Sequence, residues 1–332
     1  MIKSMQKSIC LVTGCAGNVG SNLVRSLLEN GFRVVGVDNY FSGIVANMAD
    51  FYGHPDFEFY ERSILDVTFL ENLFCELPRL SAVFHLAAII SVPYSLEHPE
   101  ETMEVNYKSS MILHELAKKY GCKAFMFAGS AAEYGNPVFR PVKEEEAGNP
   151  LSPYGLSKFM VSTAIEQSCY GCSLRFFNIY GPTRAKPGPY DGVVRAFLQR
   201  TQQGVPPVIH GDGSQTRDFV YLGDAVMALL LGAGFGSTEA LSGIYNVGTG
   251  KGTSIRELAM TAMLLAHMAG TPECGPARQG DVYNSVADNS KLRKATGWLP
   301  RTTLQWGLAS TVAFMEKVAV EQKDQLRVAH VV

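Results

Sequence analysis

The sequence predicts an α/β fold: a doubly wound parallel sheet with helices on both faces, followed by a smaller α/β domain. Strand-like and helix-like segments alternate through the first half of the chain, which is typical of repeated βα units. The strand-like runs are apolar without period-two alternation, as expected for strands buried on both faces. After Asn178 glycine and proline become frequent. We therefore expect domains at residues 1–178 and 179–332, with some later segments rejoining the first.

The first βαβ unit carries a glycine-rich turn. An apolar strand at 8–13 leads into Gly14, Gly17 and Gly20, and a helix at 21–30 then places its leucines on one side. A second strand at 33–37 ends at Asp38. Such a turn lets the backbone approach a pyrophosphate at a helix N-terminus, and the acid binds the adenosine ribose. The pattern predicts a Rossmann-like NAD site, since Asp38 would repel a 2′-phosphate; glycines that serve packing alone are the alternative.

The same alternation continues to residue 178 and then gives way to shorter elements. Apolar spacing predicts strands at 56–60, 82–86, 123–128 and 173–177, and helices at 67–76, within 99–120 and at 154–168. The second half has expected helices near 193–203, 224–232 and 254–268, and strands near 208–209, 217–221 and 244–247. Ser254 is a candidate N-cap. Because ligands bind beyond the carboxyl ends of parallel strands, we expect Asp38, Ala87, Ser130 and Asn178 to meet at one crevice.

Tyr154 and Lys158 stand four residues apart in a predicted helix, so both side chains lie on one face. A free phenol has a pKa of about 10, and a nearby ammonium favours the phenolate. The pair predicts proton transfer to and from an alcohol, with the Tyr154 pKa lowered. An ordinary Tyr and Lys on a surface helix are the alternative that this spacing alone leaves open.

Composition excludes several classes of protein. The formal net charge is -2 and no long basic run is present, so we do not expect the protein to bind nucleic acid. No apolar stretch is long enough to span a bilayer, and the first residues lack the features of a signal peptide. The 7 cysteines show no disulfide or zinc spacing, and only Cys169 and Cys172 form a C-x-x-C pair. We expect a cytoplasmic protein with reduced, mostly buried thiols and no metal site.

The complete set of motifs is more specific than any one of them. It resembles the extended short-chain dehydrogenase/reductase family, in particular the NAD-dependent nucleotide-sugar epimerases and dehydratases, over about residues 8–315. The resemblance rests on the glycine turn, His85-Leu86-Ala87-Ala88, Gly129–Gly135, Tyr154/Lys158, Arg175–Pro182 and Gly211–Val220.

The resemblance implies roles for individual residues. Tyr154 would exchange a proton with a sugar hydroxyl, Lys158 would hold the nicotinamide ribose, and Ser130 would hydrogen-bond the same hydroxyl. The implied cofactor-binding residues are Gly14, Gly17, Asn18, Val19, Gly20, Asp38, Asn39, Ser42, Ser63, Ile64, Leu86, Ala87, Ala88, Asn106, Tyr154, Lys158 and Phe177. The implied substrate-binding residues are Ser91, Ser130, Asn178, Val193, Arg217, Arg278, Asp281 and Ser285. A homodimer built on helices 99–120 and 154–168 is also implied.

Two positions after Ser130 distinguish the possible reactions. Family dehydratases carry an Asp-Glu pair there, whereas this chain has Ala131 and Ala132, and Glu133 lies one residue too late unless the register shifts. Alanine supplies neither acid nor base, which favours 4-epimerisation of a UDP-hexose through a 4-keto intermediate. A UDP-glucuronate 4-epimerase, a related dehydratase or reductase, and a non-catalytic NAD-sensing protein remain as alternatives.

The family position at Ser285 lines the pocket at the sugar 2-position, where a small residue leaves room for an N-acetyl group. With Ser91 this favours UDP-N-acetylglucosamine and UDP-N-acetylgalactosamine, with UDP-glucose and UDP-galactose as further substrates. Arg217 and Arg278 would contact the diphosphate. Two departures from the family concern the cofactor: Ser63 stands where an Asp usually reaches adenine, and Asn18 replaces an aromatic residue. Either Asp66 compensates for Ser63 or NAD is held less tightly.

Overall fold

The computed structural model describes residues 7–137, 141–184, 192–236, 239–277 and 282–329. It is built around a seven-stranded sheet with the strand order β3-β2-β1-β4-β5-β6-β11, in which each pair of neighbours is parallel. The strands are β1 (Ile9–Thr13), β2 (Arg33–Asp38), β3 (Phe57–Glu61), β4 (Ala82–His85), β5 (Phe125–Ser130), β6 (Cys172–Phe176) and β11 (Gly243–Val247). The expected doubly wound parallel sheet is confirmed, and β11 is a segment from beyond residue 178 that joins it.

Alternate residues of the strands pack into two separate hydrophobic layers. In β1, Cys10 and Val12 contact the layer formed with α1 and α8, whereas Ile9 and Leu11 contact the layer formed with α2, α5 and α6. Both layers exclude water, which explains why the strand sequences are apolar at every position. The helices of the two layers are α1 (Asn18–Glu29), α8 (Leu222–Gly232), α2 (Val67–Glu76), α5 (Ser109–Lys119) and α6 (Pro153–Ser168).

The predicted helix within 99–120 is continuous but not uniform. It consists of α4 (Pro99–Met103), a π-helical turn η2 (Glu104–Lys108) and α5. π-helical turns are rare and are found mainly at functional sites. Here the turn contains Asn106, whose side chain exchanges hydrogen bonds with the main chain of Ile89, so the helix supports the loop after β4.

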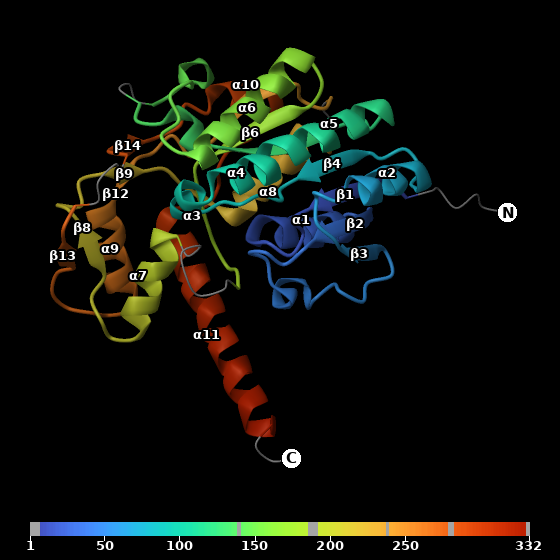
Figure 1. Cartoon of the computed structure of the whole chain (residues 1–332). Coiled ribbons are helices and arrows are strands. Elements are labelled where there is room, and N and C mark those ends of the chain that lie inside the picture. Colours follow the sequence, from blue (N-terminus) through green and yellow to red (C-terminus); the bar gives the residue numbers. More distant parts are fainter. Residues whose placement is uncertain (1–6, 138–140, 185–191, 237–238, 278–281, 330–332) are drawn as a thin grey trace.

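The second part of the chain forms a smaller lobe with its own core (Figure 1). Its helices α7 (Val193–Gln202) and α9 (Ile255–Leu265) pack against each other, and Ser254 caps α9 as expected by accepting from Glu257 N at 3.0 Å. Its short strands are β7 (Asn178–Tyr180), β8 (Val208–His210), β9 (Thr216–Arg217), β10 (Phe219–Tyr221), β12 (Thr253–Ser254), β13 (Glu273–Gly275) and β14 (Asn284–Ser285). Short single turns complete the fold: η1 (Val45–Met48), α3 (Val92–Glu97), η3 (Ala131–Tyr134) and η4 (Glu144–Glu146).

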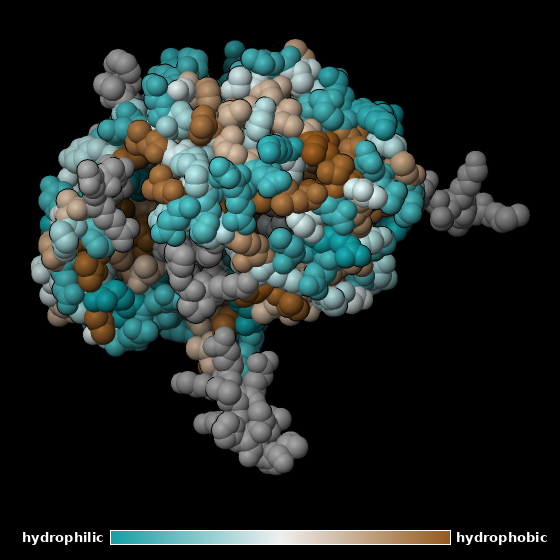
Figure 2. Space-filling model, viewed as in Figure 1, coloured by the Kyte–Doolittle hydropathy of each residue, from teal (hydrophilic) through white to brown (hydrophobic). Residues whose placement is uncertain are grey.

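Two C-terminal helices were not among the expected elements: α10 (Ser290–Thr296) and α11 (Leu304–Ala329). The first part of α11 packs on the small lobe through Leu308 and Met315, and the helix then runs outward from the body (Figure 1). Figure 2 shows hydrophobic side chains scattered in patches among polar ones on this face of the molecule. Within the described residues, no helix is both long and apolar enough to cross a membrane.

Candidate active site

The glycine turn brings the backbone of β1 and of the loop after β4 into close contact. Gly14 has a φ of +73°, and a Cβ there would lie 2.7 Å from Ala87 N. A Cβ on Gly20 would lie 2.0 Å from Gly14 O. No larger side chain fits at either position without displacing the protein's own backbone. These contacts show that the glycines are needed for packing, and the approach of the turn to a pyrophosphate stays a prediction.

Helix α1 begins inside this turn, at Asn18 rather than at residue 21. Its N-cap, Gly17, supplies no side-chain hydrogen bond, and its first turn holds no acidic residue. The first N–H groups of a helix lack partners within that helix and carry partial positive charge, which suits a pyrophosphate. The turn therefore fits the phosphates of a dinucleotide.

Asp38 ends β2 beside this turn. Its carboxylate accepts from Ala16 N at 2.9 Å and from Tyr40 N at 2.7 Å, and it is 8% exposed. Each carboxylate oxygen has further lone pairs that a ribose hydroxyl can use. Asn39 and Ser42 follow in the same loop, and Asn39 Oδ1 accepts from Phe41 N.

The region expected to hold adenine is organised by short local hydrogen bonds. Ser63 Oγ accepts from Leu65 N, Ile64 is buried, and Asp66 caps α2 by accepting from Phe69 N at 3.0 Å. Asp66 thus has a structural partner of its own. Its compensation for Ser63 stays a prediction.

Ser130 and Tyr154 are brought together by the tight packing of α6 on η3. A Cβ on Gly155 would lie 2.6 Å from Ala132 O, so only glycine allows this approach. Ser152 caps α6 by accepting from Gly155 N at 3.1 Å. The Ser130 side chain accepts from Ala132 N at 3.1 Å and also interacts with the Tyr154 phenol.

Burial raises the pKa of Tyr154; the Ser130 hydrogen bond lowers it in part, and the Glu133 charge raises it further. The expectation that Lys158 lowers the Tyr154 pKa is therefore wrong for this structure. The reason is that the cost of burying a phenolate exceeds the stabilisation that its neighbours supply. The phenol is held in its protonated form.

Lys158 lies one helical turn after Tyr154 and is 2% exposed. Its ammonium donates to Ala128 O at 2.9 Å and lies 4.6 Å from the centre of the Phe127 ring. Burial lowers the pKa of Lys158 to about 8, against which the Glu133 carboxylate raises it. An ammonium has three donors, so the Lys158 donor set fits ribose hydroxyls in addition to Ala128.

His85 lies behind Lys158 as a neutral side chain. Burial, followed by the Lys158 charge, lowers the pKa of His85 to about 3. Ser110 Oγ donates to Asn106 O at 2.6 Å, so it accepts from His85 Nε2 at 2.7 Å. Nδ1 is then the acceptor for Thr13 Oγ1, also at 2.7 Å. His85 thus links β1, β4 and the π-helical turn.

Glu133 is buried and bound by other residues of the chain. Its carboxylate is completely buried and accepts from Arg175 Nε at 2.5 Å and from Ser130 N at 2.8 Å. These partners occupy the carboxylate, and they favour a structural role for Glu133 over a part in the reaction. Sequence reasoning missed this network; the available signal was a charged residue at both 133 and 175 next to apolar strands.

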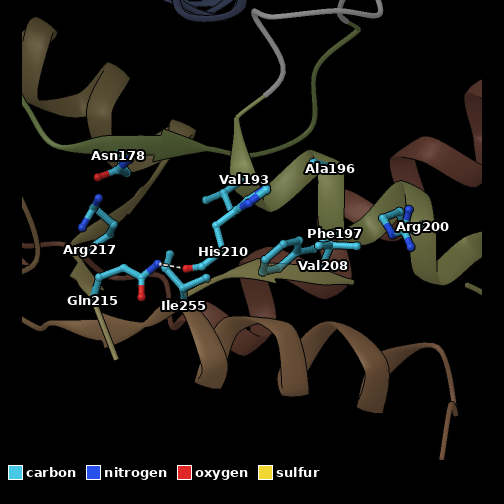
Figure 3. A pocket seen from close by; sticks show the side chains of 10 residues that line it. All are labelled: Asn178, Val193, Ala196, Phe197, Arg200, Val208, His210, Gln215, Arg217 and Ile255. Carbon is cyan, nitrogen blue, oxygen red and sulfur yellow. Dashed lines mark hydrogen bonds between the residues drawn. The ribbon is translucent and has the colours of Figure 1, made fainter. Parts of the chain in front are cut away.

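A pocket of about 420 Å³ lies in the small lobe and contains three of the predicted substrate residues (Figure 3). Asn178, Val193 and Arg217 all line it. Sequence reasoning missed the other lining residues, which are Ala196, Phe197, Arg200, Val208, His210, Gln215 and Ile255. Four of the ten share one face of α7, and their spacing, 193, 196, 197 and 200, was the available signal.

The remaining predicted residues belong neither to the group of Ser130, Tyr154 and Lys158 nor to the ten residues that line the small-lobe pocket. Ser285 pairs with Arg217 across β14 and β9, and Ser91 is buried as the N-cap of α3, where it accepts from Tyr94 N. Phe177 is buried directly before Asn178, and Leu86, Ala87 and Ala88 are half-buried in the loop after β4. Arg278 and Asp281 lie outside the described residues. Among the described residues no group of three His, Cys, Asp or Glu side chains could hold a metal ion.

Known proteins match nearly the whole chain. The model of the NAD dependent epimerase/dehydratase family matches residues 10–248. A putative UDP-glucose 4-epimerase of Methanocaldococcus jannaschii is 35% identical, with 92% of this chain and 98% of the relative covered. A UDP-N-acetyl-alpha-D-glucosaminuronate decarboxylase of Bacillus cytotoxicus is 31% identical, with 94% of this chain and 99% of the relative covered.

Solved structures of epimerases have the same fold. The UDP-glucose 4-epimerase of Thermotoga maritima, solved with UDP-glucose, is 37% identical with a TM-score of 0.84, and the match covers 94% of this chain and 99% of that chain. The UDP-N-acetylglucosamine 4-epimerase of Methanobrevibacter ruminantium, in complex with UDP-N-acetylmuramic acid, is 29% identical with a TM-score of 0.87 and the same coverage. With its glycine turn, Asp38 and the Tyr154/Lys158 pair, this chain belongs to the NAD dependent epimerase/dehydratase family, and its cofactor is NAD.

Proposed function

We propose that this protein is a UDP-sugar 4-epimerase that interconverts UDP-N-acetylglucosamine and UDP-N-acetylgalactosamine and also accepts UDP-glucose and UDP-galactose. The observation that carries the proposal is a single acid/base group at the crevice. Tyr154 interacts with Ser130, while the nearby carboxylate of Glu133 is bound by Arg175. One proton-transfer group is sufficient for oxidising and reducing the same carbon.

Each catalytic residue has one task in this reaction. Tyr154 must first lose its own proton, because burial favours the phenol; as the phenolate it takes the proton of the sugar 4-hydroxyl, and Ser130 hydrogen-bonds the oxygen on which charge develops. When bound, NAD would supply a hydride acceptor for C4 and the donor for the return of that hydride. Lys158 holds the nicotinamide ribose. After the 4-keto sugar turns over, Tyr154 gives its proton back to the oxygen, and the 4-hydroxyl has the opposite configuration.

Elimination of water or loss of carbon dioxide is less consistent with these residues. Dehydration needs a second acid and base, and Ala131 and Ala132 supply neither. Glu133 already accepts hydrogen bonds from Arg175, Ser130 and Ser162. The decarboxylase among the relatives therefore indicates a common fold more than a common reaction.

The small-lobe pocket is the proposed UDP site. Arg217 would bind the diphosphate, because a guanidinium suits phosphate oxygens, and Val193 and Asn178 would face the nucleotide. Ser285, beside Arg217, would leave room for the N-acetyl group at the sugar 2-position, with Ser91 lining the same end. Arg278 and Asp281 are proposed diphosphate and ribose contacts from the sequence alone.

The cofactor contacts are likewise proposed residue by residue. The turn residues Gly14, Gly17, Asn18, Val19 and Gly20 would hold the pyrophosphate, and Asp38 the adenosine ribose. The adenine would lie near Ser63 and Ile64, and the nicotinamide near Tyr154, Lys158 and Phe177. Asn39, Ser42, Leu86, Ala87, Ala88 and Asn106 would complete the site.

We further propose a cytoplasmic homodimer that pairs through α6 and the α4–α5 helix. Leu156 on α6 is 42% exposed, and Phe159 and Met160 beside it are only half-buried. Apolar side chains that remain in contact with water on one helix face favour association. Light scattering after size-exclusion chromatography tests this: Met160→Asp should convert a dimer to a monomer, whereas a wild-type monomer would refute the proposal.

The function is tested by supplying sugars without NAD. The purified protein is incubated with UDP-N-acetylglucosamine, UDP-glucose and UDP-glucuronate in separate reactions, and the sugars are followed by NMR. We expect a galacto-configured product from UDP-N-acetylglucosamine. Product from UDP-glucuronate alone, or net NADH formation, would favour the uronate epimerase or reductase. No product from protein that contains NAD would favour a sensing role.

A further inference from the structure

Glu133 and Arg175 form a buried ion pair directly behind Ser130. The Glu133 side chain has no exposed surface and the Arg175 side chain is 1% exposed. Burying two charges is costly unless both are fully hydrogen-bonded. The hydrogen-bond partners of the two side chains therefore indicate the role of the pair.

Glu133 connects β6 with the two segments that carry the proposed catalytic residues, the end of β5 and α6. Oε1 accepts from Ser130 N at 2.8 Å and from Ser162 Oγ on α6 at 3.0 Å. Oε2 accepts from Arg175 Nε on β6 at 2.5 Å. Through one carboxylate the Ser130 main chain is fixed to α6, the helix that carries Tyr154 and Lys158.

Arg175 has further partners that keep its side chain in place. Its Nη1 donates to Glu144 O at 2.6 Å and to Tyr134 Oη at 3.2 Å. Glu144 itself accepts from Asn246 N at 2.8 Å, on the far side of Arg175 from Ser130. The arginine thus orients Glu133 without reaching the crevice.

The charge of Glu133 also acts on Lys158. The Lys158 ammonium donates to the Ala128 carbonyl and lies over the Phe127 ring, and its charge acts on the neutral imidazole of His85. Burial disfavours the ammonium, and Glu133 is the carboxylate whose charge supports it. The Glu133 charge also raises the pKa of Tyr154, so it favours the protonated form of both side chains.

We propose that Glu133 is a positioning residue, whose buried carboxylate holds Ser130 in place against α6 and is the counter-charge of the Lys158 ammonium. The proposal relies on the proposed function only for the roles of Ser130, Tyr154 and Lys158. Glu133 itself touches neither sugar nor cofactor in this account. This positioning role accounts for a charged pair, Glu133 and Arg175, at a buried site between apolar strands.

The test is an NMR titration of Lys158 in the full-length protein labelled with ¹³C-lysine, with the signal assigned from Lys158→Met. In the wild type the ammonium should titrate near pH 8. In Glu133→Gln the midpoint should move to lower pH, because the supporting negative charge is gone. Glu144→Gln is the matched control: it neutralises a carboxylate near Arg175 that does not contact Ser130, and its midpoint should equal that of the wild type.

Activity gives a second readout with UDP-N-acetylglucosamine. Glu133→Gln should lower kcat by about 10²-fold through misplacement of Ser130, with KM and bound NAD unchanged, and its alkaline loss of activity should begin at lower pH. If the single variant does not fold with Arg175 unpaired, Glu133→Gln combined with Arg175→Gln removes both charges and should lower the midpoint by less than Glu133→Gln, because the loss of the arginine cation offsets part of the change.

An unchanged Lys158 midpoint in the folded variants would overturn the proposal and leave a purely structural ion pair, which would alter only the melting temperature. Failure of the proposed function is a different result. In that case the wild type would turn over none of the sugars, and the Lys158 titration would still decide the role of Glu133.

Discussion

The region of Ser130, Tyr154 and Lys158 at the edge of the sheet, where the sequence predicts the crevice, and the pocket of the small lobe are built in opposite ways. At the crevice the charged groups are buried and bound: Lys158 is 2% exposed and Glu133 is not exposed at all. In the small lobe, Arg200, His210, Gln215 and Arg217 line a pocket of about 420 Å³ and are all partly exposed. The first region thus holds buried, hydrogen-bonded charges, and the second is a pocket lined with partly exposed polar groups.

This difference assigns chemistry and specificity to different parts of the chain. A group that must transfer a proton gains from a dry, fixed setting, where its pKa is set by neighbours. A site that must admit a large nucleotide-sugar gains from partial exposure and long side chains. Substitutions at the crevice should therefore change kcat, and substitutions in the pocket should change KM or substrate preference.

The largest expected effect is at Tyr154. Tyr154→Phe should reduce kcat by about 10²–10⁴-fold, because it removes the proton-transfer group and little else. Bound NAD, measured by absorbance after denaturation, should remain. Tyr170→Phe is the control, since the Tyr170 hydroxyl donates to Cys122 O far from Ser130. Near-normal turnover of Tyr154→Phe would refute the assignment.

His85 tests how strongly the crevice excludes charge. Its pKa is about 3 in the folded protein, well below 6.5, so the unfolded chain binds the proton first and acid favours unfolding. Stability should fall by ~1.4 kcal/mol for each pH unit below 6.5 until pH reaches about 3, and His85→Gln should lack this part of the slope. Urea unfolding at a series of pH values measures both. Parallel curves would mean that His85 is not buried neutral.

Arg217 tests the pocket side of the comparison. Arg217→Ala should raise KM for UDP-sugars by about 10–100-fold, the loss expected for a hydrogen bond to a charged group. The kcat should change little, since the guanidinium binds the diphosphate equally in the ground and transition states. Arg217→Lys keeps the positive charge but lacks the planar guanidinium, so its KM should lie between those of the wild type and Arg217→Ala. A loss confined to kcat would place Arg217 in the chemistry instead.

Of these substitutions, Ser285→Tyr should have the smallest effect on total activity and the clearest effect on the preference between N-acetylated and plain UDP-sugars. A phenol beside Arg217 would fill the space proposed for the N-acetyl group. The ratio of kcat/KM for UDP-N-acetylglucosamine over UDP-glucose should drop by about 10-fold or more. Ser285→Ala is the control and should leave the ratio unchanged. An unchanged ratio in Ser285→Tyr would remove Ser285 from the sugar pocket.

The sequence predicted the parallel sheet well because its signals are local. The apolar runs of β1 to β6 and the glycines at 14, 17 and 20 each need only neighbouring residues to be recognised. The interaction of Ser130 with Tyr154 also followed, since strand ends and helix starts meet at one edge of the sheet. The long helix α11 was missed, because its apolar stripe is weak beyond Met315.

The features of the site that the sequence did not predict depend on burial and on contacts between residues far apart in the chain. The raised pKa of Tyr154 depends on how the folded chain surrounds the phenol, which no spacing reveals. The Glu133–Arg175 pair joins residues from two distant segments, and only the adjacency of β5 and β6 brings them together. The lining of the small-lobe pocket likewise needs α7, β8 and β9 to be placed in space.

The central claim, that one carbon is oxidised and reduced again within one closed site, has a direct isotopic test. The protein is incubated in water, without added NAD, with UDP-N-acetylglucosamine that carries deuterium at C4, and the product is examined by NMR and mass spectrometry. The account predicts a galacto-configured product that keeps the deuterium at C4. Product in which solvent hydrogen has replaced the deuterium, or deuterium lost without epimerisation, would contradict it.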